Sequence, residues 1–216
     1  MVEEDVTKTS GFSLIEVLLT IAIMAIIVGI AVGPFREMYV RSKLEDRAGA
    51  LHETFKWAQT EAMRRGETEI VDGAIVKKRI YVGVNQNEKS YVVFEWRDEN
   101  KNNLQEASEF TILQKGGLQE SSFGLLPTIN LKACGNTVGA PADSVVNLTA
   151  LSCPSTFSEA AGLRCMRFDG KGFLSESMQN AACYVTNGIS AYAVALNPAG
   201  IMTLCRWGGS SWVNVR

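Results

Sequence analysis

The chain has 216 residues, of which 46% are hydrophobic and 20% charged, and its formal net charge at pH 7 is −2. This length accommodates one ordinary globular domain and one additional segment. The near-neutral balance lacks the dense basic surface on which salt-dependent nucleic-acid binding usually rests.

The additional segment is the apolar stretch "KTSGFSLIEVLLTIAIMAIIVGIAVGPF" at residues 8–35. From Val17 to Phe35 only Thr20 is polar, and 19 helical residues span about 28 Å, close to the thickness of a bilayer's hydrocarbon core. Glu16 stands at the start of this run, where an unpaired carboxylate costs roughly 2.5 kcal/mol or more. Since the apolar run holds no basic residue, we expect the partner of Glu16 to lie outside the chain.

The apolar segment has three plainer interpretations: a signal peptide, a single-pass anchor and a buried core helix. A secretory signal peptide has a shorter apolar region and then a cleavage site of small residues, whereas here a long charged helix follows directly. An ordinary single-pass anchor and a buried core helix remain as alternatives.

The residues around the charge carry a more specific signal. "GFSLIE" followed by an apolar run resembles the processing site of type IV prepilins and of the related secretion pseudopilins. In this resemblance Gly11 is the last leader residue, Phe12 is the first mature residue and Glu16 lies four residues further on.

The resemblance implies a processing route and an assembly mechanism. A membrane aspartyl peptidase, the prepilin peptidase, would cut after Gly11 on the cytoplasmic side and methylate the amino group of Phe12. Glu16 would then neutralise the Phe12 amino group of a neighbouring subunit in a helical filament. The chain would sit in the bacterial inner membrane with its N-terminus cytoplasmic and its head periplasmic.

The apolar segment ends at "AVGPF", where Gly33 and Pro34 predict a melted or bent helix, because proline removes one helical hydrogen bond. Beyond it, apolar residues from Leu44 to Ala62 recur in steps of three and four, which predicts an amphipathic helix. Arg64 and Arg65 suit its last turn, and Gly66 suits a left-handed cap.

From Gly66 onward the pattern changes to short segments rich in β-branched and aromatic residues. They predict an antiparallel β head and therefore an α+β protein, with the long helix of the type IV pilin fold packed on the sheet. "RFDGKGFLSES" and "ALNPAGIMTLCRW" predict hairpins that turn at Asp169-Gly170 and at Asn197 to Gly200. These hairpins and the helix end "FKWAQTEAMRRGE" resemble the GspH/FimT-like branch of minor pilins and pseudopilins. The expected strands are "IYVGV", "SYVVFEW", "FTILQ", "TINLKA", "LRCMRF", "AYAVALN" and "IMTLCRW".

All five cysteines lie in the last 83 residues, within the part that this topology places outside the cytoplasm, where disulfides persist. Their spacing does not fix the connectivity, since two bridges among five cysteines can be drawn in 15 ways. As one choice we predict Cys134 with Cys153 and Cys183 with Cys205, which leaves Cys165 as a buried core residue.

We expect no enzyme, no cofactor and no metal site. The only histidine, His52, stands among polar helix positions and is predicted to be solvated, and neither a nucleophile motif nor a phosphate-binding loop is present. Asp169 and Glu176 could pair as carboxylates, but aspartate is expected in a turn in any case.

DNA binding is a second class of function. FimT-like pilins are associated with DNA uptake through a basic C-terminal tail, and this tail holds two arginines and two tryptophans. Residues 160–216 carry a local charge of only +3, and solvated arginines beside tryptophans that close the sheet edge are the favoured interpretation. The DNA candidates are Arg206, Trp207, Trp212 and Arg216.

The predicted organisation is a leader (1–11), a transmembrane and filament-core helix (12–35), an amphipathic helix half (36–65) and a β head (66–216). We predict a minor pilin that helps to initiate or cap a type IV pilus-like filament, with other subunits, prepilin peptidase and the inner membrane as partners. The alternatives are an H-type pseudopilin of a type II secretion system and a DNA-binding receptor for natural transformation.

Overall fold

The structure is a computed structural model, and it describes residues 13–126, 129, 134, 153–159, 161–174, 181–197 and 199–215. The chain divides into an N-terminal unit, Met1–Ser42, and a C-terminal unit, Lys43–Arg216, which are described separately.

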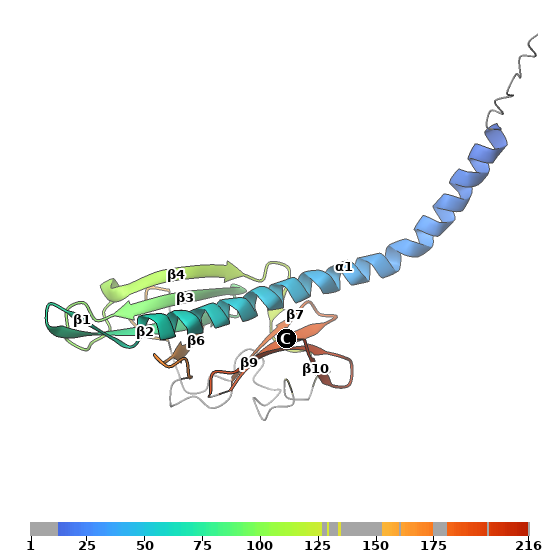
Figure 1. The fold of residues 1–216 in the computed structure, drawn as a ribbon. Coiled ribbons are helices and arrows are strands. Elements are labelled where there is room, and N and C mark those ends of the chain that lie inside the picture. Colours follow the sequence, from blue (N-terminus) through green and yellow to red (C-terminus); the bar gives the residue numbers. More distant parts are fainter. Residues whose placement is uncertain are drawn as a thin grey trace, which may run out of the picture. The chain divides into compact units, whose positions relative to one another are not determined.

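One helix, α1, spans Leu14–Arg65 and runs through both units (Figure 1). Pro34 lies inside α1, and the helix continues across Gly33 and Pro34, so the helix does not melt there, and of the two predicted alternatives the melted one is wrong. The reason is that a proline removes only one backbone donor, while the turns on either side keep their own hydrogen bonds.

The end of α1 agrees with the sequence pattern. The last helical residue is Arg65, and Gly66 follows with φ +65°, the left-handed conformation that a glycine adopts without a Cβ penalty. The Gly66 N–H donates to the Ala62 carbonyl at 2.9 Å, which satisfies one carbonyl of the last turn.

Sheet 1 is antiparallel and five-stranded, in the order β1-β2-β3-β4. The fifth strand, β6, pairs with the edge of β2 that lies opposite to β3. The long strand β2 pairs with β1 through its first residues and with β3 and β6 through its later ones. The strands are β1 (Thr68–Val71), β2 (Ala74–Asn85), β3 (Ser90–Arg97), β4 (Phe110–Gly117) and β6 (Leu163–Phe168), and the 3-10 turn η1 (Ala107–Glu109) precedes β4.

Sheet 2 is also antiparallel, in the order β10-β9-β8-β7-β5. Its strands are β5 (Ser122–Phe123), β7 (Ala181–Thr186), β8 (Ala191–Leu196), β9 (Met202–Trp207) and β10 (Trp212–Asn214). Strands β7 and β8 are buried along their whole length, which fits their small and β-branched composition.

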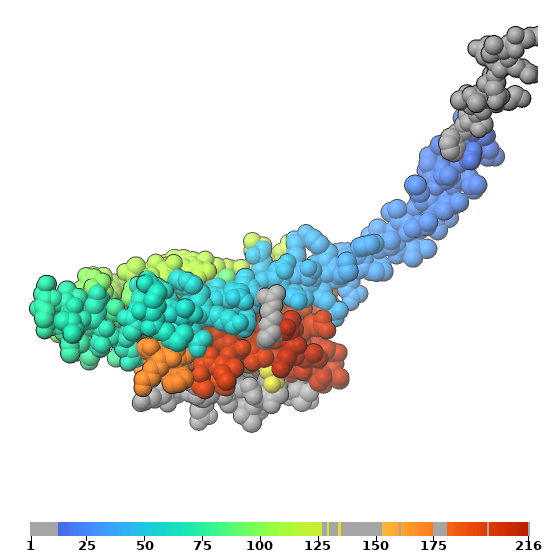
Figure 2. All heavy atoms as spheres, viewed as in Figure 1, coloured from blue at the N-terminus to red at the C-terminus, as the bar shows by residue number. Residues whose placement is uncertain are grey.

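The main core of the C-terminal unit lies between α1 and the inner faces of both sheets. Every third or fourth residue of α1 from Leu44 to Ala62 is buried, as the amphipathic pattern predicts. These side chains share one cluster with residues of sheet 1 such as Val82 and of sheet 2 such as Val194. Figure 2 shows the C-terminal strands, in red, directly against this part of α1.

Two similar turns fasten the sheets to α1. Asp169 and Asn197 each accept backbone N–H groups with their side-chain oxygen, and Gln59 of α1 donates to the Gly172 and Gly200 carbonyls at 2.6 and 2.9 Å. A Cβ at Gly200 would lie 2.3 Å from the Gly172 oxygen, so the close approach of the turns requires glycine there.

The α+β class is confirmed, and so is the hairpin turn at Asn197 to Gly200 that joins β8 and β9. Phe168 and Leu174 form a bridge around the Asp169-Gly170 turn, as expected for the other hairpin. The sequence pattern missed β7, the short strands β5 and β10, and β1. The expected strand "TINLKA" falls almost entirely outside the described residues.

Candidate assembly site

Glu16 lies in the first turn of α1. The Ser13 carbonyl accepts the N–H groups of Glu16 at 3.0 Å and of Val17 at 3.3 Å, which starts the helical hydrogen bonding here. A carboxylate at this position interacts favourably with the positive end of the helix dipole. Within the described part of the chain the Glu16 carboxylate forms neither an ion pair nor a hydrogen bond.

The surroundings of Glu16 are apolar and exposed on every side of the helix. All residues from Ser13 to Phe35 are exposed except Ala31, which is half-buried. Among the described residues, α1 is the one helix long and apolar enough to cross a membrane. A helix that is apolar all round is stable only inside a membrane or against other protein, so this part of α1 needs partners that the described residues of the chain do not supply.

The predicted cleavage residues Gly11 and Phe12 lie outside the described residues. The structure therefore places Glu16 and the apolar helix of the predicted assembly site, but not the processing site beside them.

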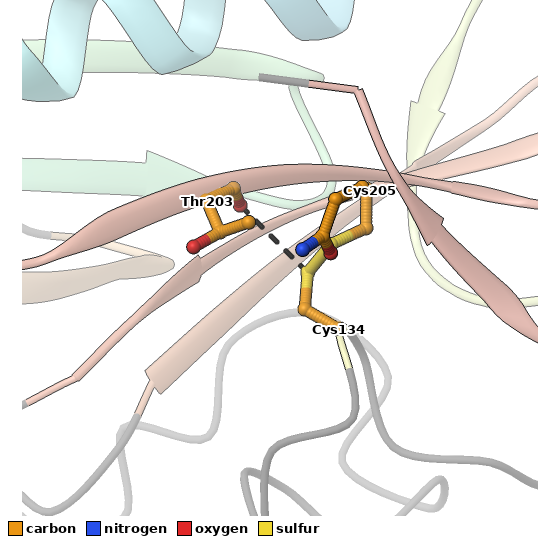
Figure 3. The surroundings of a disulfide bond; sticks show 4 residues. Cys134, Thr203 and Cys205 are labelled. Atoms are coloured by element: carbon orange, nitrogen blue, oxygen red, sulfur yellow. Dashed lines mark hydrogen bonds between the residues drawn. A yellow bond between two sulfur atoms is a disulfide. The ribbon is translucent and has the colours of Figure 1, made fainter.

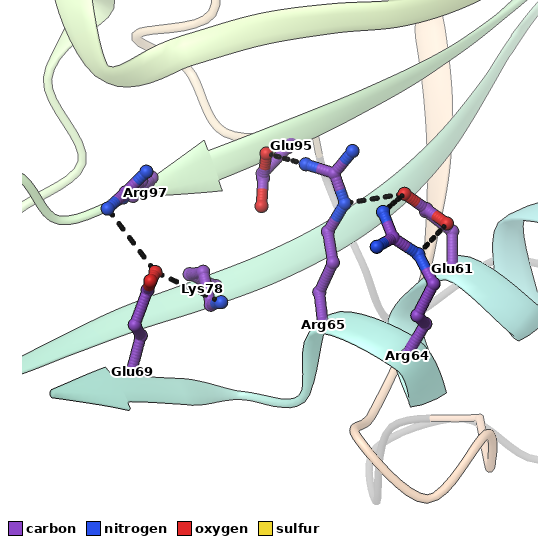
Figure 4. A network of polar contacts seen from close by, with 7 residues as sticks. All are labelled: Glu61, Arg64, Arg65, Glu69, Lys78, Glu95 and Arg97. Atoms are coloured by element: carbon purple, nitrogen blue, oxygen red, sulfur yellow. Dashed lines mark hydrogen bonds and ion pairs between the residues drawn. The ribbon is translucent and has the colours of Figure 1, made fainter.

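The other end of α1 is held by a chain of ion pairs (Figure 4). Glu61 accepts from Arg64 at 2.5 and 2.8 Å and from Arg65 at 2.6 Å, and Arg65 also pairs with Glu95 of β3. The Arg64 and Arg65 hydrogen bonds lower the pKa of Glu61 to about 2, against the opposing effect of its burial. The network thus joins the last turn of α1 to sheet 1.

A second group of charges lies at the β1–β2 hairpin. Lys78 and Arg97 each lie 3.2 Å from the Glu69 carboxylate, and both lower its pKa, Lys78 more strongly (Figure 4). The Arg79 guanidinium lies 5.1 Å from the centre of the Trp96 ring. Residues 77–79 are three consecutive basic residues, and two of them, Lys78 and Arg79, therefore have structural partners.

The disulfide prediction is wrong. One bond joins Cys134 to Cys205, with Cα atoms 5.7 Å apart (Figure 3). The other joins Cys153 to Cys165, with Cα atoms 4.9 Å apart. Cys183 is the free thiol.

Strand alternation explains why Cys183 and Cys205 do not pair. Cys183 of β7 lies in the core beneath α1, whereas Cys205 of β9 follows the core residue Leu204 and so points to the opposite face of sheet 2. Burial among apolar side chains strongly raises the pKa of the Cys183 thiol, which makes it unreactive.

The prediction that His52 is solvated is also wrong, because this side chain of α1 is fully buried. Burial, and then the charge of Lys56, lower the pKa of His52, although Glu53 with an oxygen 3.6 Å from Nδ1 opposes this. His52 is therefore a neutral interior residue rather than a solvated one.

The three DNA candidates that the structure describes do not form one surface. Trp207 and Trp212 are cross-strand neighbours with ring centroids 5.5 Å apart, and Trp212 also contacts Tyr184. Arg206 alternates with Trp207 along β9 and so points to the opposite face of sheet 2. Arg216 lies outside the described residues.

No group of three or more metal-ligating side chains occurs among the residues that the structure describes. Glu176, which sequence analysis considered beside Asp169, lies outside them, while Asp169 organises its own turn.

Residues 7–32 match the family described as "Prokaryotic N-terminal methylation motif". No curated protein and no solved structure matches the chain. The matched residues indicate a type IV pilin-like protein or pseudopilin processed by prepilin peptidase, and the long apolar helix with its antiparallel sheets is consistent with the type IV pilin fold.

Proposed function

Starting from a chain that carries this methylation motif, we propose that the protein is a minor pilin of the GspH/FimT-like branch, which helps to initiate or cap a type IV pilus-like filament. The observation that carries the proposal is the Glu16 carboxylate, unpaired among the described residues, in the part of α1 from Leu14 to Phe35 where the large apolar side chains are exposed on all sides. The motif match covers Glu16 and most of the apolar run.

In this proposal the leader is cut after Gly11, and the Phe12 amino group is methylated and stays positively charged. Glu16 of one subunit then pairs with the Phe12 amino group of its neighbour as the apolar helices pack. Pairing in a medium of low dielectric constant is strong when the geometry is good, and a carboxylate left unpaired there is costly. The charge therefore favours one docking position over others.

The proposed location follows from the same helix. The apolar residues would span the bacterial inner membrane with the N-terminus in the cytoplasm and the C-terminal unit in the periplasm. The disulfides Cys134–Cys205 and Cys153–Cys165 support this placement, because such bonds persist in oxidising compartments.

The role is proposed to be structural and not enzymatic. Glu61, the carboxylate with the strongly lowered pKa, is engaged in ion pairs at the end of α1, and the buried His52 and Cys183 lie in the interior. These residues support the fold instead of forming a reactive group.

The two alternative functions differ in their support. An H-type pseudopilin would use the same leader, helix and Glu16 chemistry. A DNA receptor draws no support from the described part of the C-terminal tail, because Arg206 and the two tryptophans point to opposite faces of sheet 2.

A substitution at Glu16 tests the proposal. In cells that assemble the filament, Glu16→Ala is expected to be processed normally but to enter filaments at least tenfold less, because the neighbour's amino group loses its partner. Glu37→Ala, which removes an exposed carboxylate further along α1, is the matched control and is expected to be incorporated normally. Filaments that contain Glu16→Ala at the wild-type level would contradict the pairing mechanism.

A further inference from the structure

The loop that joins β3 to β4 carries oxygen-bearing side chains at regular positions. Its residues 98–109 are "DENKNNLQEASE", with Asp at the first position, Asn at the third and fifth, and Glu at the ninth and twelfth. This spacing matches the pattern D-x-[DN]-x-[DN]-G-x₅-E of calcium-binding loops, apart from the glycine at the sixth position. The proposed assembly mechanism uses none of these residues.

The exception at the sixth position keeps the backbone conformation that the pattern requires. Calcium-binding loops have glycine there because the chain turns sharply. Asn103 occupies this position with φ +60°, and asparagine is one of the few residues besides glycine that adopt the left-handed conformation routinely. The loop therefore makes the same turn with a different residue.

The first and the last acidic residues of the loop are buried. Asp98 is 1% exposed and Glu109 is 6% exposed. A buried carboxylate is costly unless a cation and hydrogen bonds compensate for the lost water. Over the described ranges neither carboxylate pairs with a basic side chain, and Arg97, the neighbour of Asp98, pairs with Glu69 instead. Two buried negative charges therefore lack a counter-charge from the described protein.

Both buried carboxylates are directed toward the loop backbone. The Asp98 oxygens lie 3.1 and 3.3 Å from the Asn103 nitrogen, and this N–H is the one group that Asp98 accepts among the described residues. Glu109 accepts the Trp96 indole N–H at 3.0 Å with Oε2 and the Asn100 N–H at 3.4 Å with Oε1. Since an ionised carboxylate has about four acceptor sites, Asp98 keeps most of its capacity for a further partner.

Neutral oxygens occupy the positions between the two carboxylates. Asn100 accepts the Asn102 N–H at 3.1 Å, and Asn102 accepts the Leu104 N–H at 2.7 Å, so both side-chain oxygens point back toward the loop. Leu104 stands at the seventh position, where calcium-binding loops supply a backbone carbonyl. The described residues hold no group of three His, Cys, Asp or Glu side chains, but calcium also accepts amide and backbone oxygens.

The chemistry of these groups selects the ion. All of them are oxygens, which suit calcium and magnesium better than the softer transition metals. Calcium accepts about six to eight oxygens in a flexible geometry, whereas magnesium demands a near-ideal octahedron and keeps its water. We propose that the loop 98–109 binds one Ca²⁺ through the side chains of Asp98, Asn100, Asn102 and Glu109 and the carbonyl of Leu104. This departs from the expectation, drawn from the sequence, that the chain has no metal site.

The test is isothermal titration calorimetry on the full chain in detergent, after treatment with a chelator and without reductant. The titrants are CaCl₂ and MgCl₂. One Ca²⁺ per chain is expected to bind with a Kd of about 1 mM or tighter, the range of extracellular calcium-binding modules, and Mg²⁺ at least tenfold more weakly.

Variants then locate the ion. Asp98→Asn and Glu109→Gln keep the shape of the side chain but remove one charge each, and each is expected to weaken Ca²⁺ binding at least tenfold. Glu99→Gln is the matched control, because it removes an exposed carboxylate from the second position of the same loop, which supplies no ligand. Its affinity is expected to stay unchanged. Asn102→Ala, at an exposed position, is also expected to weaken binding, and it tests the ligand set even if a variant at a buried carboxylate fails to fold.

Four results would overturn the proposal. These are no Ca²⁺ binding up to about 10 mM, Mg²⁺ binding as tight as that of Ca²⁺, wild-type affinity in folded Asp98→Asn and Glu109→Gln, or a loss in Glu99→Gln as large as in Glu109→Gln. The last result would mean that calcium responds to the overall negative charge of the chain and not to this loop.

Discussion

The two halves of α1 are built for different surroundings. Between Leu14 and Phe35 the large apolar side chains are exposed, whereas between Lys43 and Arg65 a regular stripe of apolar side chains is buried against two sheets. Both halves are helical, so helicity alone does not distinguish them. The difference shows that the second half obtains its packing from this chain, while the first half requires a membrane or other subunits.

The same substitution in each half gives the sharpest contrast. Leu51 is fully buried and Leu19 is 60% exposed. Leu51→Ala is expected to reduce the free energy of unfolding by about 2–5 kcal/mol through the lost contacts and the cavity, and Leu19→Ala by less than about 0.5 kcal/mol. Denaturant unfolding of the full chain in detergent, followed by tryptophan fluorescence, measures both. Equal losses would contradict the contrast.

The disulfides are the next largest contribution to the stability of the C-terminal unit. The Cys134–Cys205 bond has a sequence separation of 71 residues and the Cys153–Cys165 bond one of 12, so loop entropy predicts about 4 and 3 kcal/mol respectively. The double variants Cys134→Ser/Cys205→Ser and Cys153→Ser/Cys165→Ser are each expected to unfold more easily. Cys183→Ala is the control that leaves both bonds intact, and non-reducing peptide mapping that found Cys183 in a bond would refute the connectivity.

His52 is expected to make the C-terminal unit less stable in acid. Its pKa is lowered in the folded protein, so below about pH 6.5 the unfolded chain binds a proton that the folded chain does not, and stability declines as the pH falls. The slope of this single group is at most about 1.4 kcal/mol per pH unit. Unfolding of wild type and His52→Leu between about pH 7 and pH 5 should give a flatter dependence for the variant. Parallel curves would mean that His52 is not a neutral buried group.

The Glu61 ion pairs are expected to contribute less to the free energy of unfolding, and their contribution changes in a more acidic pH range than that of His52. Because the folded pKa of Glu61 is about 2 against an ordinary 4.5, its stabilisation is complete above about pH 4.5 and is lost as the pH falls towards 2. Glu61→Gln is expected to cost about 1 kcal/mol at neutral pH, since Arg64 is well exposed to solvent. Glu69→Gln, at a more exposed carboxylate, is the comparison and should cost less. A larger loss for Glu69→Gln would reverse this ranking.

Local sequence patterns predicted the features that are set within one element or between two consecutive elements. The end of α1 at Arg65, its buried stripe and the Asn197 to Gly200 turn all follow from periodicity and turn chemistry. The strand β7 was missed because "AACYVT" is buried on both faces and has none of the alternation that marks a half-exposed strand.

Pairings between distant residues could not be predicted. The disulfides depend on which face of its sheet each cysteine occupies, and His52 is buried where α1 lies beside the backbone of Met202 in β9. Gly33 and Pro34 predicted a melted or bent helix, and the helix does not melt there, since the loss of one hydrogen bond does not melt a long helix.

The central claim is that the chain is processed as a filament subunit, and its most direct test is the intact mass and N-terminal peptide map of the protein from its native membrane without reductant. The account predicts a chain that begins at methylated Phe12 and contains two disulfides. Gly11→Val, which should block cleavage, is expected to accumulate as full-length precursor. A wild-type chain that still begins at Met1 with five free thiols would contradict the account and leave an ordinary anchored protein.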